Sequence, residues 1–229
     1  MRTNESAAGS TRLLHRLTAA LLALGISFPA GAEYVIGPGL AFPVPGKLLT
    51  SEEKKEGSLT ASYPVSRDPN LLKRARINAV TEVEMNRYAR WLEKAGEHAP
   101  VTGMFLWNEG SDGAETGYTG LVLLESHYFK GAAHPMTYAR GYVFDALGQK
   151  VPLSDLMPDL TAEQVWDLTK AQCAERQIPL FPDASIKKIP SQYYLGKDRH
   201  VYLIYPLYEI APYSSGFITV DLGIPEILK

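Results

Sequence analysis

The chain has 229 residues, a formal net charge of −2 and one cysteine, Cys173. It holds no basic block that could neutralise phosphates, which excludes a nucleic acid as partner. The lone cysteine excludes an intramolecular disulfide and a thiolate metal cluster. A chain of this length can bury one good core or two small ones.

The N-terminus, residues 1–32, is predicted to be a signal peptide. Two arginines and a histidine precede the apolar run 17–28, and three small residues at 30–32 follow it. This order is typical of a secretory signal, and the run is shorter than the about 20 apolar residues that span a bilayer. We expect cleavage after Ala32 and a periplasmic or secreted protein with no membrane span. Cleavage moves the net charge to −4, because three arginines and one glutamate leave.

Residues 33–57 are predicted to form a tether, because glycines and prolines come first and the charged run 51–57 follows. A strand is expected at 58–65. A long helix, at about 69–95, should then begin with Asp68 as N-cap and Pro69 at its first position.

The apolar side chains of this helix form two stripes that are out of phase. Both have spacings of three and four, which favours a helix that is bent or covered on two sides. The stripes consist of Leu72, Ala75, Ala79 and Val83, and of Tyr88, Trp91, Leu92 and Ala95. Arginines and glutamates between them, including Glu84 and Arg87, are typical of a solvated face.

The rest of the chain is predicted to be mainly antiparallel sheet with one shorter helix, at about 161–176, which starts at Thr161 with Glu163 and Gln164 placed for a capping interaction. A short helical turn is expected at 153–157. Strands are expected at 101–107, 118–129, 136–145, 191–195, 201–207 and 217–222. The fold class is therefore α+β: a mainly antiparallel sheet packed by a long and a shorter helix, in one domain at 58–229.

Five short motifs follow one another at regular places in this domain. They are YFKGAAHP at 128–135, YVFD at 142–145 with Gly148, VPLSDL at 151–156, YYL at 193–195 and YEIAPYSSG at 208–216. In order and spacing they resemble a family of bacterial extracytoplasmic domains, domain of unknown function 3298, with an N-terminal half of the 4163 type. Members form the outer domain of RsiV-type anti-sigma factors and the N-terminal region of PdaC-type peptidoglycan deacetylases. Gly131 is followed by alanine where the family has a second glycine.

The resemblance implies an α+β fold with halves at about 58–130 and 131–224, and it implies no cofactor. It suggests a non-catalytic binding domain of the cell envelope. The expected partner is a lysozyme-like muramidase, as in the RsiV type, or peptidoglycan, as in the PdaC type. The alternative is an enzyme that modifies envelope glycans through an unrecognised carboxylate pair, for which Glu209 and Asp145 are candidates.

Other chemistry finds little support in the sequence. The histidines at 98, 127, 134 and 200 lack the spacing of a metal site, so none is predicted. A serine nucleophile elbow and phosphate-binding loops are absent from the sequence. We therefore predict no catalytic, metal or cofactor residues.

Two groups of residues are candidates for contact or structural roles. The motif residues are expected to be mainly structural: His134, Tyr208, Glu209, Pro212, Tyr213 and Gly216. Glu209 lies between two prolines that interrupt a sheet ladder, so it could accept hydrogen bonds from unpaired backbone N–H groups. This bracing role is favoured over a ligand contact, and catalysis comes third.

The second group is acidic and lies in a polar turn predicted at 108–117, where Glu109, Asp112 and Glu115 occur without a basic residue. Such a turn could steer a basic partner, or it could be a solvated hairpin tip. Ten of the thirteen tyrosines lie between 118 and 213. They indicate either an aromatic core or an exposed binding surface, and an exposed aromatic patch would indicate binding.

Overall fold

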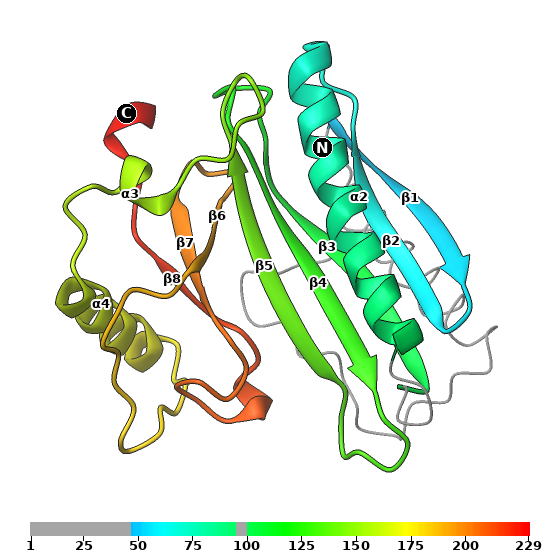
Figure 1. Ribbon diagram of the computed structural model, residues 1–229. Coiled ribbons are helices and arrows are strands. Elements are labelled where there is room, and N and C mark those ends of the chain that lie inside the picture. The colour runs from blue at the N-terminus through cyan, green and yellow to red at the C-terminus, as the bar shows by residue number, and fades with distance from the viewer. Residues whose placement is uncertain (1–46, 95–99) are drawn as a thin grey trace, which may run out of the picture. The chain divides into compact units, whose positions relative to one another are not determined.

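The computed structural model describes residues 47–94 and 100–229 (Figure 1). The predicted signal peptide and residues 33–46 of the predicted tether lie outside the described residues. Among the helices that are described, none combines the length and the apolar character that crossing a bilayer requires.

The larger sheet contains five strands in the order β1-β2-β3-β4-β5. These are β1 (Leu49–Glu56), β2 (Leu59–Ser66), β3 (Thr102–Asp112), β4 (Thr119–Tyr128) and β5 (Met136–Phe144). Helix α2 (Leu71–Lys94) connects β2 to β3, which are parallel, and the other pairs are antiparallel. This mixture of mostly antiparallel strands and a long helix confirms the predicted α+β class.

The tether prediction is wrong for residues 49–56. They form β1, which pairs with β2 along its whole length, from Leu49 opposite Ser66 to Glu56 opposite Leu59. Leu49 is buried, and the charged residues that follow are exposed, as expected for a solvated run. Charges on an edge strand discourage pairing with other chains, so the same run can be both solvated and part of the sheet.

Helix α2 begins two residues later than the cap prediction required. Asn70 is the N-cap, because its side-chain oxygen accepts hydrogen bonds from the backbone N–H groups of Leu72 and Lys73, at 3.0 and 3.2 Å. Asp68 instead accepts from the Asn70 N–H and forms a buried ion pair with Lys73. The predicted capping residue therefore anchors a buried lysine.

The buried face of α2 also differs from the prediction in the first half of the helix. Leu72 and Val83 are exposed. The face against the sheet consists of Lys73, Ile77, Thr81, Met85, Tyr88 and Leu92. Apolar spacing misplaced this face because a lysine and a threonine are buried on it. Both are satisfied there: Lys73 Nζ lies 2.7 Å from the Gly117 carbonyl, and Thr81 donates to the Ile77 carbonyl.

A second sheet follows in the chain, where the sequence analysis had expected its strands to complete the first. Its antiparallel strands are β6 (Gln192–Leu195), β7 (Val201–Tyr205) and β8 (Ile218–Asp221). Helix α4 (Ala162–Glu175) packs on it through Val165 and Cys173 and has the predicted capping box of Thr161 and Gln164. The short helix α3 (Leu153–Leu156) precedes it.

The two sheets meet where β6 crosses three glycines of the first sheet. A Cβ atom on Gly110 or Gly120 would lie 2.0 or 2.1 Å from the Leu195 carbonyl oxygen, and one on Gly141 would lie 1.9 Å from that of Tyr193. Only glycine allows backbones to approach so closely. Because side chains alternate along a strand, this leaves the neighbouring residues of β4 and β5 on the face where α2 lies.

Candidate functional site

A groove lies between α2 and the outer strands of the first sheet. Figure 1 shows α2 lying across β2 and β3, with the ribbons of β4 and β5 beside it. The groove contains a pocket of about 260 Å³. We call it the aromatic–arginine pocket; it is lined by Arg87, Tyr88, Trp91, Glu125, His127, Tyr138 and Arg140.

Two glutamates and two arginines form an ionic network in and beside this pocket. Arg87 binds Glu84 through Nε at 3.0 Å and Glu125 through Nη2. Arg140 binds Glu125 through Nε at 3.1 Å, and the Tyr142 hydroxyl donates to Glu84 at 2.8 Å. The four charges sum to zero, and their mutual contacts hold planar donor and acceptor groups in fixed orientations.

Glu84 is an ionised member of the network. Burial alone would raise its pKa, but hydrogen bonds from Tyr142 and Arg87 and the charges of Arg87 and Arg140 outweigh burial, and the pKa of Glu84 is lowered. Burial, followed by the hydrogen bond to Glu84, raises the pKa of the Tyr142 hydroxyl. A carboxylate held in this way accepts hydrogen bonds and is a poor general acid near neutral pH.

Aromatic rings form the other wall of the pocket. The ring of His127 lies 4.7 Å from that of Trp91, 5.2 Å from that of Phe129 and 5.9 Å from that of Tyr138, centre to centre. Trp91, Phe129 and Tyr138 are 41%, 38% and 49% exposed, whereas His127 is buried. Soluble proteins rarely leave such groups of large rings in water without a binding role.

His127 behaves as part of this apolar wall. Burial lowers its pKa, so the neutral imidazole is favoured. Its Nδ1 atom is buried without a hydrogen-bond partner in the described part of the chain. A neutral ring packed between other rings adds stacking surface to the pocket without adding charge.

The structure joins two of the sequence motifs in a second aromatic cluster. His134, in the turn between β4 and β5, lies 2.7 Å from the Tyr208 hydroxyl through Nε2, and its ring stacks on Tyr213 at 3.6 Å. The Tyr213 hydroxyl donates to the Pro135 carbonyl at 2.9 Å. These contacts link the β4–β5 turn to the loop between β7 and β8.

The backbone of the YEIAPYSSG motif is unusual at both of its ends. Tyr208 has φ of 66° and Gly216 has φ of 68°, a region that residues with a side chain seldom adopt. Pro212 precedes the 3₁₀ turn Tyr213–Ser215. The motif residues thus shape the loop and link it to the β4–β5 turn.

Glu209 is exposed, and within the described residues its carboxylate makes no hydrogen bond or ion pair. The predicted brace is therefore wrong. The bulge it was expected to satisfy is a turn in which the Glu209 N–H donates to the Pro206 carbonyl. Partial loss of water around the carboxylate raises its pKa, and the charge of Lys188 partly opposes this.

The predicted acidic turn is shorter than expected. Strand β3 continues to Asp112 and carries Glu109 opposite Leu121, so the turn begins at 113. Asp112 accepts hydrogen bonds from the Ala114 and Lys47 backbone N–H groups, at 2.9 and 3.1 Å, and Glu115 is exposed. The ammonium of Lys73 binds the Gly117 carbonyl, which places a basic group beside the turn.

The residues of the aromatic–arginine pocket were not identified as a site from the sequence. Glu84 and Arg87 had been assigned to a solvated helix face, and the tyrosine-rich β region could not be distinguished from a core. The missing information is which strand residues face α2. Glu125 lies 38 residues after its partner Arg87 in the chain, and Arg140 lies 15 residues after its partner Glu125.

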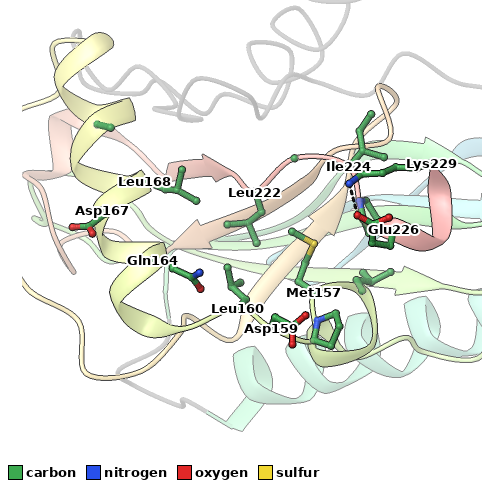
Figure 2. Close-up of a pocket in the computed structure, with 15 residues that line it drawn as sticks. Met157, Asp159, Leu160, Gln164, Asp167, Leu168, Leu222, Ile224, Glu226 and Lys229 are labelled. Atoms are coloured by element: carbon green, nitrogen blue, oxygen red, sulfur yellow. Dashed lines mark hydrogen bonds and ion pairs between the residues drawn. The ribbon is translucent and has the colours of Figure 1, made fainter.

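A larger hollow, of about 850 Å³, lies beside α4. Figure 2 shows Leu160, Leu168, Leu222 and Met157 along it, with the Glu226–Lys229 ion pair at one end. Its walls are mainly apolar, and Asp159 and Asp167 belong to its lining. It lacks the interlocked donors and acceptors of the aromatic–arginine pocket, which therefore offers more specific chemistry despite its smaller volume.

Comparisons with known proteins agree with this fold. Residues 153–224, which include α4 and the second sheet, match the family model described as "Protein of unknown function (DUF3298)". A crystal structure of a DUF3298 family protein from Pseudomonas aeruginosa PAO1 covers 81% of this chain and 93% of its own, with a TM-score of 0.51 and 18% identity. A family member from Bacteroides fragilis NCTC 9343 has a TM-score of 0.49 and 16% identity over 78% and 91% of the two chains. No curated protein matched the sequence.

Proposed function

We propose that this protein is an exported, non-catalytic domain that binds glycan chains of the cell envelope in the aromatic–arginine pocket. The carrying observation is that exposed rings of Trp91 and Tyr138 stand beside a charge-neutral network of Glu84, Glu125, Arg87 and Arg140. A pyranose ring has an apolar C–H face and a rim of hydroxyl groups. The rings suit the face, and the fixed carboxylates and guanidinium groups suit the rim.

The zero sum of the network charges separates this ligand class from others. A polyanion would require unpaired cations, and a cationic ligand would require an unpaired carboxylate in the pocket. Both arginines and both glutamates are paired with one another. A neutral sugar ring that is rich in hydroxyl and amide groups needs neither in this pocket, and it keeps the network intact.

The cell-envelope setting rests on the predicted signal peptide and on the resemblance to RsiV-type and PdaC-type domains with a 4163-type N-terminal half. That resemblance offers a lysozyme-like muramidase as the alternative partner. The acidic turn that could steer such a basic partner gives it limited support, because Asp112 is engaged by backbone groups and Lys73 lies close by. Peptidoglycan glycan is therefore the ligand that we favour.

The test is binding of purified sacculi and of soluble N-acetylglucosamine oligomers, measured by co-sedimentation and calorimetry. Replacing Trp91 and Tyr138 with alanine should weaken binding at least about tenfold, since each stacked ring contributes on the order of 1 kcal/mol. Tyr208→Ala is the matched control, because Tyr208 is 48% exposed and Tyr138 is 49% exposed. Equal binding by the double variant would refute the proposal. Loss of binding in Tyr208→Ala alone would move the site to the motif loop.

A further inference from the structure

A second pocket, of about 230 Å³, lies along the outer edge of β5. We call it the β5-edge pocket. Its polar and aromatic lining comes from Arg140, Tyr142, Lys150, Ser191, Gln192 and Tyr193. Arg140 also lines the aromatic–arginine pocket, so the two pockets share this residue.

The two pockets differ in charge. The described residues that line the β5-edge pocket include two cationic side chains and no carboxylate. Lys150 Nζ lies 4.6 Å from the centre of the Tyr142 ring, and no described carboxylate lies within ion-pair distance of it. The ring contact orients the ammonium without neutralising it. The pocket therefore presents one uncompensated positive charge beside a charge-neutral site.

Hydrogen-bond donors in this pocket are also free. Arg140 uses Nε for Glu125, and within the described residues its terminal Nη groups have no partner. Gln192 is fixed in place, since its Oε1 accepts from the Gly141 N–H at 3.1 Å and its Nε2 donates to Ser191. The Ser191 hydroxyl keeps its own proton to donate. Lys150, Arg140 and Ser191 together can serve two acceptor oxygens.

We propose that the β5-edge pocket is a subsite for a carboxylate group carried by the glycan that the aromatic–arginine pocket holds. This inference rests on the proposed function, and it narrows the ligand to an acidic sugar. One uncompensated charge matches a monoanionic carboxylate better than a phosphate monoester, which carries about −1.5 to −2. The shared Arg140 places the carboxylate next to the ring stacked on Trp91 and Tyr138.

The test uses two trisaccharides that differ in one group. Both contain a central N-acetylmuramic acid between N-acetylglucosamine units, and one has the muramic carboxylate converted to its amide. In calorimetry at low salt, the acid should bind about tenfold more tightly than the amide, because charge-assisted hydrogen bonds are about twice as strong as neutral ones. Lys150→Gln should remove this preference by weakening binding of the acid more than binding of the amide. Lys55→Gln, the same change at an exposed lysine of β1, should keep it.

The outcomes distinguish the two proposals. Equal affinities for acid and amide, with both lost in the Trp91 and Tyr138 double variant, overturn the carboxylate subsite and keep the glycan site. Preference for the acid that depends on Lys150 but not on the two rings supports the subsite and overturns the stacked glycan. Binding of neither trisaccharide to the wild-type protein refutes both.

Discussion

Strand β5 serves two purposes on its two faces. On one face Gly141 and Val143 lie against the second sheet, and β6 approaches so closely that Gly141 cannot carry a side chain. On the other face Tyr138, Arg140 and Tyr142 are only partly covered and form the groove beside α2. Alternation along a strand lets one segment hold the layers together and present polar and aromatic groups to a ligand.

The comparison also explains why the groove can be rigid. The glycine contacts fix the backbone of β5 against β6, and the ionic network fixes the side chains that project the other way. A site on strands is held more precisely than one on loops. Substitutions on each face of β5 separate these two roles.

Gly141→Ala should break the tightly packed face. Its Cβ would lie 1.9 Å from the Tyr193 carbonyl oxygen, so the two sheets must separate, at a cost of about 3 kcal/mol or more in the free energy of unfolding. Chemical denaturation measures this loss in the free energy of unfolding. In Gly131→Ala the new Cβ atom would have no other atom within 4 Å of it. Only the positive φ would be strained, which should lower the free energy of unfolding by about 1 kcal/mol. Equal losses in the two variants would mean that the sheets are not in contact there.

Glu125→Ala should break the groove face at lower cost. Glu125 is 5% exposed and accepts from two guanidinium groups, but Arg87 and Arg140 can turn towards water once it is removed. We expect a loss of about 2 kcal/mol in thermal or chemical unfolding, below the cost of a fully buried broken pair. Glu125→Gln, which keeps one acceptor oxygen, should lose less. A loss as large as that of Gly141→Ala would contradict this ranking of the two faces.

Glu84→Gln should change how stability depends on pH. Because the folded-state pKa of Glu84 lies below its ordinary value of 4.5, its stabilisation is fully present above that value and is lost as the pH falls through the folded pKa. The variant should be about 1 kcal/mol less stable at pH 7 and equal to the wild type in strong acid. Melting temperatures from pH 7 down to pH 2 measure this. If the melting temperatures of the variant and the wild type changed in parallel with pH, the ionised Glu84 would not stabilise the fold.

Glu209→Gln should have the smallest effect, because this carboxylate makes no hydrogen bond or ion pair with the residues that the structure describes. Its folded-state pKa is raised, so its ionised form slightly destabilises the fold above that pKa and has no effect below the ordinary 4.5. The variant should match the wild type or be more stable by less than about 0.5 kcal/mol at pH 7. A clear drop in melting temperature would restore the bracing role that the structure does not show.

Local signals in the sequence were enough for most elements. The capping box of Thr161 and Gln164 set the start of α4, and alternating β-formers located the strands to within a few residues, except for β3 and β1. The motif at 208–216 was recognisable as a loop because its prolines and glycine restrict the backbone. These signals act over a few residues, so they can be interpreted without knowledge of the fold.

Tertiary structure alone decided which side of each element is buried and which distant charges meet. Lys73 could be buried because Asp68 and the Gly117 carbonyl satisfy its ammonium, and that allowed Leu72 to face water. The close backbone contact between the two sheets exists because β6 crosses the first sheet at Gly110, Gly120 and Gly141. Arg87 met Glu125 only when β4 lay beside α2. The reason is physical: burial and pairing depend on the partner that supplies the missing hydrogen bond or the space, and that partner lies elsewhere in the chain.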